Sequence, residues 1–320
     1  MNATIFPPPH LHPGYRLLSE KVAEAGLGPA DPLTQHLDEA RCRADRYYRF
    51  LGGQPEPVKH VFDAIFPGPL GPTRVRIYQP QTLSPLPVAL YFHGGGYALN
   101  SIDTHDTLLR ILANESGVAI CSLAYSKAPE ARFPTQLHEA LHLLDWLNRE
   151  GLELGLDISR IALTGDSAGA HLALTTALAL PKNDRKNLRG LALAYGMYEP
   201  SLDTASHRAF GRGYGLTSER MRWFWSHFLP PAQDRSSPLV APLWAELAGL
   251  PPTLLQAAEL DCLKDDSLRL AKRLTAAAVP TTLSVYEGMQ HAFLMAPPWL
   301  PPARQAITEI AEFLKSQLIV

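Results

Sequence analysis

The 320-residue chain has little of what marks several large classes of protein. Its three cysteines, Cys42, Cys121 and Cys262, are too few and too scattered for a disulfide framework and fit a reducing compartment. No apolar run is long enough to span a bilayer, and the proline- and histidine-rich segment from Met1 to Arg16 lacks the apolar centre of a secretory signal. The formal net charge is −2, with no long run of one sign. We therefore expect a cytoplasmic protein that binds neither nucleic acid nor membrane.

What the chain does have is a regular alternation of short apolar segments and amphipathic helical patterns. Hydrophobic residues make up 46% of the sequence, enough for one large domain. The predicted strands are Val58–Phe66, Thr73–Tyr78, Val88–Phe92, Val118–Leu123, Ile161–Thr164, Leu191–Ala194, Thr253–Ala258 and Thr282–Tyr286. The predicted helices between and after them are Thr104–Glu115, Phe133–Asn148, Ala168–Leu180, Ser267–Ala277 and Arg304–Leu318. This pattern indicates an α/β fold with a mostly parallel sheet of about eight strands and helices on both faces.

Two segments depart from the alternation. Residues 1 to about 50 look helical and polar-faced, and the segment 199–240 is rich in aromatic residues, with a helix predicted after Thr217. The aromatic insertion would lie above the strand ends, where it could act as a lid that lines an acyl pocket. The alternative is an additional packing helix whose aromatic side chains fill a core of their own.

The pentapeptide Gly165-Asp166-Ser167-Ala168-Gly169 lies where a predicted strand gives way to a predicted helix. A serine at the tip of such a strand–turn–helix unit is typical of a nucleophile elbow, in which flanking glycines leave room for a strained backbone. The backbone N–H of Ala168 and the helix N-terminus would then face the oxygen of a reacting carbonyl. Ser167 is therefore the candidate nucleophile.

A glycine run, His93-Gly94-Gly95-Gly96-Tyr97, directly follows another predicted strand. Backbone N–H groups that no side chain shields can approach a ligand closely, so Gly94, Gly95, Gly96 and Ala168 are candidates to hold an oxyanion. A phosphate-binding loop is the alternative, but neither G-x-G-x-x-G nor the Gly-Lys-Ser/Thr ending of a P-loop is present. We expect His93 to organise the loop by hydrogen bonding.

The candidate acid and base follow the last two predicted strands. His291 lies in the loop after the final strand, behind a glycine turn, where it could take the proton of the serine. Asp261 precedes it in the chain, in the serine, acid, histidine order of α/β-hydrolases, and could orient the imidazole. Glu259 at the strand end, and Asp265 and Asp266 in the first turn of the next helix, compete with Asp261 for this role.

Together these motifs resemble the hormone-sensitive lipase group of α/β-hydrolases, and among them the bacterial acetyl esterases. The resemblance covers residues from about 60 to 318. It includes the HGGG and GDSAG motifs, Tyr125-Ser126-Lys127-Ala128-Pro129-Glu130 with Phe133-Pro134, Asp261-Cys262-Leu263-Lys264-Asp265, and Gly288 with His291-Ala292-Phe293. One departure is Cys262, where the family usually has proline.

The resemblance implies an α/β-hydrolase fold and a cofactor-free serine carboxylesterase for short acyl esters, acetyl to about hexanoyl. Its catalytic residues would be Ser167, Asp261 and His291, and its oxyanion donors would come from Gly94, Gly95, Gly96 and Ala168. It also implies N-terminal cap helices in residues 1–50, a hydrolase core in 51–198 and 241–320, and a cap insertion in 199–240. The expected partner is a small-molecule ester, and a homodimer is an arrangement that the resemblance allows.

Three other functions have some support in the sequence. His138-Glu139-Ala140-Leu141-His142 matches the H-E-x-x-H motif of zinc peptidases, but the leucine stripe of this helix would leave both histidines at its polar margin, and no third ligand is apparent. We therefore expect no metal. An amidase such as an arylformamidase shares the fold and differs only in the leaving group. A non-catalytic hydrolase-fold binding protein would have lost the histidine that this chain retains.

Overall fold

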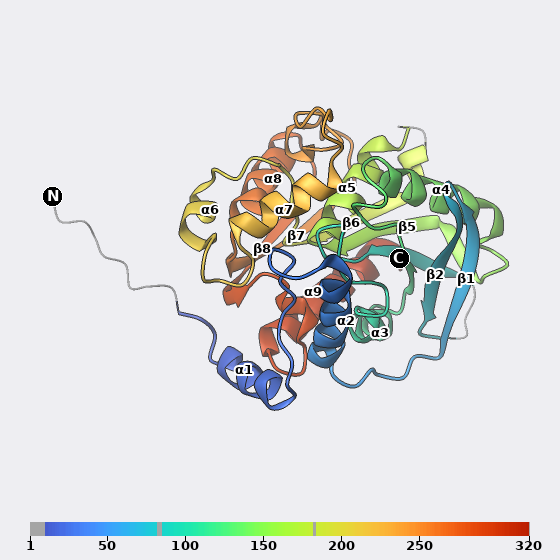
Figure 1. The fold of residues 1–320 in the computed structure, drawn as a ribbon. Helices are drawn as coiled ribbons and strands as arrows, with labels where there is room; N and C mark the ends of the chain where they lie inside the picture. Colours follow the sequence, from blue (N-terminus) through green and yellow to red (C-terminus); the bar gives the residue numbers. More distant parts are fainter. Residues whose placement is uncertain (1–9, 82–84, 182–183, 320) are drawn as a thin grey trace.

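The computed structural model describes residues 10–81, 85–181 and 184–319 (Figure 1). Within these ranges eight strands form one sheet in the order β1-β2-β4-β3-β5-β6-β7-β8. The strands are β1 (His60–Gly68), β2 (Gly71–Gln79), β3 (Leu86–Phe92), β4 (Ala119–Leu123), β5 (Leu156–Asp166), β6 (Leu188–Ala194), β7 (Thr253–Leu260) and β8 (Thr281–Gln290). Strands β1 and β2 pair antiparallel, as do β2 and β4, and all other neighbours are parallel.

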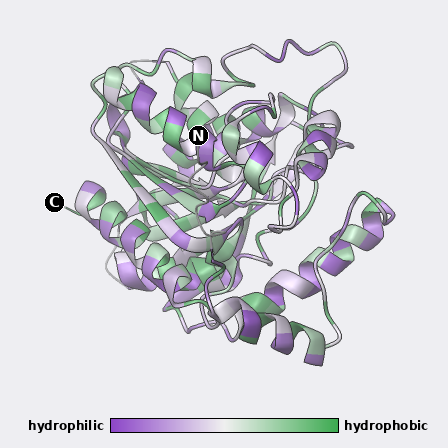
Figure 2. Cartoon of the chain, turned by 90° about the vertical axis from the view of Figure 1, so that its left-hand side faces the viewer, coloured by the Kyte–Doolittle hydropathy of each residue, from purple (hydrophilic) through white to green (hydrophobic). Residues whose placement is uncertain are grey.

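Helices cover both faces of this sheet, as the alternation predicts. They are α1 (Gly14–Glu24), α2 (Leu37–Gly52), α3 (Asp106–Ser116), α4 (Thr135–Glu150), α5 (Ala168–Ala179), α6 (Ala205–Phe210), α7 (Ser218–Phe228), α8 (Lys264–Ala276) and α9 (Pro301–Leu318). One apolar core joins the sheet to α4, α5, α7 and α8, and a second joins it to α1, α3 and α9. Figure 2 shows the hydrophobic strands at the centre and helices on which hydrophilic and hydrophobic residues alternate, as expected for elements half buried against a sheet.

All eight predicted strands are present, but several of their ends were predicted wrongly. Strand β5 begins at Leu156 instead of Ile161, because Leu156 and Asp157 pair with the start of β3 across a register shift. Strand β8 continues to Gln290 instead of ending at Tyr286, again across an irregularity, and so carries the chain to the edge of the site. None of the helices in the described ranges is long and apolar enough to cross a membrane.

Two pairs of helices fall outside the strand–helix alternation. Helices α1 and α2 precede the sheet, and α6 and α7 lie between β6 and β7. Their positions in the chain match the segments for which the sequence predicts a cap. The division into a cap and a core stays a prediction at this point.

Candidate active site

Ser167 occupies the turn between β5 and α5, with φ 54° and ψ −117°. A non-glycine residue in this region is strained by about 1–3 kcal/mol, and the surroundings must hold it there. The flanking glycines show how this is achieved, because a Cβ on Gly165 would lie 2.5 Å from the carbonyl oxygen of Phe92, and one on Gly169 only 1.8 Å from it. The turn therefore packs directly against the end of β3, and its serine hydroxyl stands beyond the strand ends.

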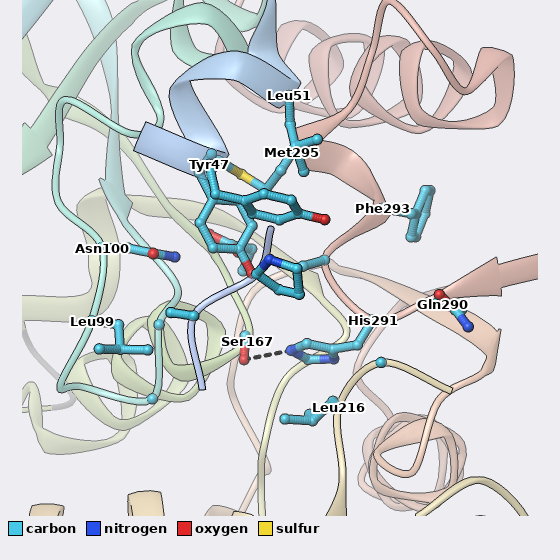
Figure 3. Close-up of a pocket in the computed structure, with 18 of the residues that line it drawn as sticks. Tyr47, Leu51, Leu99, Asn100, Ser167, Leu216, Gln290, His291, Phe293 and Met295 are labelled. Carbon is cyan, nitrogen blue, oxygen red and sulfur yellow. Dashed lines mark hydrogen bonds between the residues drawn. The ribbon is translucent and has the colours of Figure 1, made fainter. Parts of the chain in front are cut away.

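The side chains of Ser167, His291 and Asp261 lie in one hydrogen-bonded series, part of which is drawn in Figure 3. Nε2 of His291 is 2.9 Å from the Ser167 hydroxyl oxygen, and Nδ1 is 2.6 Å from Oδ2 of Asp261. The other carboxylate oxygen of Asp261 accepts the backbone N–H of Leu263 at 3.0 Å. Asp261 is 1% exposed, so its charge acts on the imidazole with little screening by solvent. The structure thus brings together three side chains that the sequence places in three separate loops.

The competing carboxylates are engaged elsewhere. Each accepts a different backbone N–H, and none has a hydrogen bond to His291 among the described residues. Glu259 accepts from Gly288, Asp265 from Ser206 and Asp266 from Tyr198, at 2.7, 2.9 and 2.8 Å. Glu259 is held to the neighbouring strand β8, and both aspartates lie in the first turn of α8, as the sequence indicated. Of the four candidates, Asp261 alone reaches the imidazole in the described part of the chain.

The glycine loop after β3 does not offer all its N–H groups to a ligand. The N–H of Gly94 donates to Oδ1 of Asp166 at 2.8 Å, so it is not free to bind an oxyanion. The N–H groups of Gly95, Gly96 and Ala168 have no acceptor among the described residues. Both Gly95 and Gly96 have positive φ, 119° and 61°. The four candidates therefore reduce to three.

Asp166 is a residue whose role the sequence analysis missed. Its buried carboxylate accepts from the Tyr91 hydroxyl at 2.9 Å and from the Gly94 N–H, and lies 3.1 Å from Nε2 of His105. Burial opposes ionisation here, but the charge and hydrogen bond of His105, with these other donors, keep the pKa of Asp166 below its ordinary value. The sequence did offer one signal for this role, an acidic residue directly before the candidate nucleophile. The groups that donate hydrogen bonds to its carboxylate, however, come from segments far away in the chain.

His93 organises the loop in the way the sequence indicated. Its ring nitrogen Nδ1 donates to the carbonyl oxygen of Gly94 at 2.8 Å, and the Tyr125 ring stacks on it with centroids 4.2 Å apart. The Tyr125 hydroxyl also donates to the His93 carbonyl oxygen at 2.6 Å. Burial lowers the pKa of His93 to about 3, so it is neutral near pH 7.

A cavity of about 280 Å³ opens over the serine. Its lining residues come from several segments far apart in the chain, as Figure 3 shows. Helix α2 contributes Tyr47, Tyr48 and Leu51, and the glycine loop with the residues after it contributes Gly95, Gly96, Leu99 and Asn100. Helix α7 and the turn before it contribute Leu216, Arg220, Met221 and Phe224. The segment after β8 contributes His291, Phe293 and Met295. The walls are therefore mostly apolar, with a few polar groups among them.

Helix α7, in the aromatic insertion, has aromatic side chains both in the cavity wall and in the core. Phe224 lines the cavity and packs so closely on the glycine loop that a Cβ at Gly96 would lie 2.1 Å from its ring. Phe228 and Trp225 are buried more deeply than Phe224, and the ring of Phe228 stacks on Tyr97 with centroids 3.8 Å apart. One helix thus contributes both to the cavity wall and to the core.

The H-E-x-x-H motif lies on α4 but does not form a site. Both histidines, His138 and His142, are exposed, whereas Glu139 is buried and accepts from the backbone N–H and hydroxyl of Ser126 at 2.8 and 2.5 Å. The glutamate therefore points away from the histidines. No cluster of three His, Cys, Asp or Glu side chains able to hold a metal occurs in the described ranges.

Comparison with known proteins agrees with this geometry. A family model described as alpha/beta hydrolase fold matches residues 89–295, more than half of the chain. The chain is 31% identical to the ethyl acetate hydrolase of Pseudomonas putida over 307 residues, 93% of this chain and 96% of the relative. It is 34% identical over 256 residues to an acetyl esterase of Salmonella dublin, covering 79% of each. Among solved structures, an esterase of Pyrobaculum calidifontis matches with a TM-score of 0.86 and 32% identity, over 96% of this chain and 98% of that one. The chain therefore belongs to the hormone-sensitive lipase group of the α/β-hydrolase family and is a carboxylic ester hydrolase.

Proposed function

We propose that the chain hydrolyses short-chain esters, acetyl to about hexanoyl, through a covalent acyl-enzyme on Ser167. The observation that carries the proposal is the series of hydrogen bonds from Ser167 through His291 to Asp261, at 2.9 and 2.6 Å. A serine hydroxyl becomes a good nucleophile when a base takes its proton, and the base needs a partner that fixes its tautomer. In the proposed mechanism His291 is the base, and Asp261 is the partner that fixes its tautomer.

The proposed reaction has two steps. Ser167 Oγ attacks the ester carbonyl while Nε2 of His291 takes its proton, and the imidazolium then protonates the departing alcohol, leaving the acyl group on Ser167. In the second step His291 takes a proton from water, which attacks the acyl carbonyl, and the proton passes to Ser167 as the acid leaves. Asp261 stabilises the imidazolium in both steps. The reaction requires only groups of this chain and water.

The proposed oxyanion donors are the N–H groups of Gly95, Gly96 and Ala168. Ala168 also begins α5, so the positive end of the helix dipole lies beneath the oxyanion. Each such donor contributes about 3–4 kcal/mol to the stabilisation of the transition state in enzymes of this type.

The size of the cavity and the relatives together support short acyl groups. A space of about 280 Å³ holds a small ester, and the named relatives are an ethyl acetate hydrolase and an acetyl esterase. We propose that the helices of residues 1–50 and the insertion 199–240 cap the site over the core of residues 51–198 and 241–320. Residues from α2 and α7 in the cavity wall support this division.

The test compares Ser167→Ala with Ser316→Ala, which removes a hydroxyl from the exposed end of α9. With 4-nitrophenyl acetate, the control variant should show normal turnover and a bound acetyl group by mass spectrometry after acid quench. Ser167→Ala should lack both, with an unchanged circular dichroism spectrum. Near-normal turnover by Ser167→Ala would rule the mechanism out.

A series of nitrophenyl esters graded by acyl length tests the substrate range. We expect kcat/KM to peak between acetyl and hexanoyl, and a rate that keeps rising beyond octanoyl or at an oil–water interface would contradict the proposal. An N-formyl amide in the same series tests the amidase alternative. A cytoplasmic location and a homodimer stay predictions, and light scattering on the purified protein tests the second.

A further inference from the structure

Asn100 is a polar residue in the cavity wall that the proposed reaction does not use. It lies just after the glycine loop, is only 7% exposed and lines the cavity over Ser167. In Figure 3 its amide points from the loop toward the cavity. A Cβ on Gly95 would lie 3.1 Å from Cβ of Asn100, so the side chain is directly beside one of the proposed oxyanion donors.

The amide of Asn100 is not satisfied by the protein. Its Oδ1 has no hydrogen-bond partner among the described residues, although the atom is buried. Buried polar atoms are normally paired, because leaving one unpaired costs free energy. Oδ1 has almost no accessible surface, so the end of the amide that a substrate in the cavity can reach is Nδ2, which also lacks a partner among the described residues.

The backbone conformation explains only part of the presence of asparagine. Asn100 has φ 61°, in the left-handed region that asparagine tolerates better than most residues. Glycine would meet that requirement without burying an amide. The backbone conformation at this position therefore does not require the asparagine side chain.

We propose that the Asn100 amide binds a hydroxyl group of the ester substrate. A hydroxyl both donates and accepts, so it can accept a hydrogen bond from Nδ2 of the amide. The proposal rests on the proposed function, and it names the substrate class as short esters that carry a hydroxyl on the acyl or the alcohol part. Sites built to bind a hydroxyl discriminate against analogues that lack it.

The test uses two pairs of esters in which a hydroxyl replaces a methyl group of similar size. Ethyl 3-hydroxypropanoate is compared with ethyl butanoate for the acyl part, and 2-hydroxyethyl acetate with propyl acetate for the alcohol part. In each pair the measured quantity is kcat/KM for the hydroxyl ester divided by kcat/KM for the alkyl ester. The pair whose ratio responds to substitution at Asn100 identifies the part of the ester that is bound.

The variants are Asn100→Gly, which suits φ 61° and removes the amide, and Asn100→Asp, which keeps an acceptor oxygen in place. We expect Asn100→Gly to lower the ratio about five- to tenfold in one pair, and Asn100→Asp to retain it. The proposal would be overturned if Asn100→Gly left the ratio unchanged in both pairs, as it would if kcat/KM fell equally on the hydroxyl and alkyl esters. It would also be overturned if Asn100→Gly and Asn100→Asp lowered the ratio equally. Each of these results would leave ester hydrolysis intact. Failure of the unmodified protein to hydrolyse any of the four esters would overturn the proposed function as well.

Discussion

The carboxylate of Asp166 accepts the backbone N–H of Gly94, with 2.8 Å between Oδ1 and the nitrogen. Asp166 directly precedes the serine at the end of β5, and Gly94 begins the glycine loop after β3. The bond therefore ties the nucleophile turn to the loop that carries two of the proposed oxyanion donors. Tyr91 and His105 hold the same carboxylate from the sheet and from the start of α3, so its position is fixed from several directions.

Asp166→Asn should impair catalysis more than it impairs folding. An amide presents one acceptor and one donor, so it cannot accept from all the groups that now point at the carboxylate. The glycine loop should then shift, and we expect kcat to fall about 10- to 100-fold with a smaller change in KM. Steady-state kinetics with a short nitrophenyl ester measure both. The matched control is Asp157→Asn at the other end of β5, and similar kcat values for the two variants would contradict a positioning role for Asp166.

Gly96→Ala should disrupt the glycine loop through two separate effects. The added Cβ would lie 2.1 Å from the Phe224 ring, and alanine at φ 61° is strained by about 1 kcal/mol or more. We expect kcat/KM to fall about 100-fold. Gly213→Ala is the control, since Gly213 has φ 81° but no heavy atom of the described residues lies within 4 Å of an added Cβ.

A double variant separates the steric effect from the backbone effect. Adding Phe224→Ala to Gly96→Ala removes the clash but leaves the strain, so it should restore part of the lost activity. Activity that stays as low as in the single variant would show that contact with α7 is not what requires glycine at this position.

Asp261→Asn should lower kcat by about 10⁴-fold, because asparagine no longer fixes the required tautomer of His291 or stabilises the imidazolium. Asp265, a nearby carboxylate that is not hydrogen-bonded to His291 in the described part of the chain, provides the control. Asp265→Asn alters a carboxylate whose hydrogen bond, among the described residues, comes from the Ser206 N–H in α6, and it should cost less than tenfold. Steady-state kinetics of both variants on the same ester check this. If Asp265 were the catalytic acid, Asp265→Asn would lower kcat more than Asp261→Asn does.

Much of this architecture could be predicted because it depends on local patterns. Short apolar runs between amphipathic helices indicate a parallel sheet, and the ends of its strands meet at one edge. Ser167, Asp261 and His291 each follow a predicted strand, so their convergence follows from topology, and the hydrogen bonds between them in the structure agree with it.

What the sequence did not predict depends on contacts between segments far apart in the chain. The bond between Asp166 and Gly94 joins residues 72 positions apart and removes one of the four candidate oxyanion donors. Neither periodicity nor spacing contains this information, since it depends on how closely β3 and β5 pack. The mixed role of α7 has the same cause, because Phe224 and Phe228 lie four residues apart but meet different neighbours.

Asp266 should make the stability of the protein depend on pH in the neutral range. Burial raises the pKa of this carboxyl to about 7, against about 3.9 in an unfolded chain. Between these values the folded protein retains a proton that the unfolded chain has released, so the free energy of unfolding falls as pH rises from about 4 to about 7. Above pH 7 the full cost of ionising a buried group is present.

Asp266→Asn should remove this dependence, because an amide stays neutral and its oxygen can still accept the Tyr198 N–H. At pH 8 we expect the variant to be more stable than the unmodified protein by up to about 4 kcal/mol, three pKa units at about 1.4 kcal/mol each. At pH 4 the two should converge. Urea unfolding at several pH values measures the difference, with Asp145→Asn on the exposed face of α4 as the control. A difference that grows toward pH 4, or a variant no more stable at pH 8, would mean that Asp266 ionises as an ordinary carboxyl.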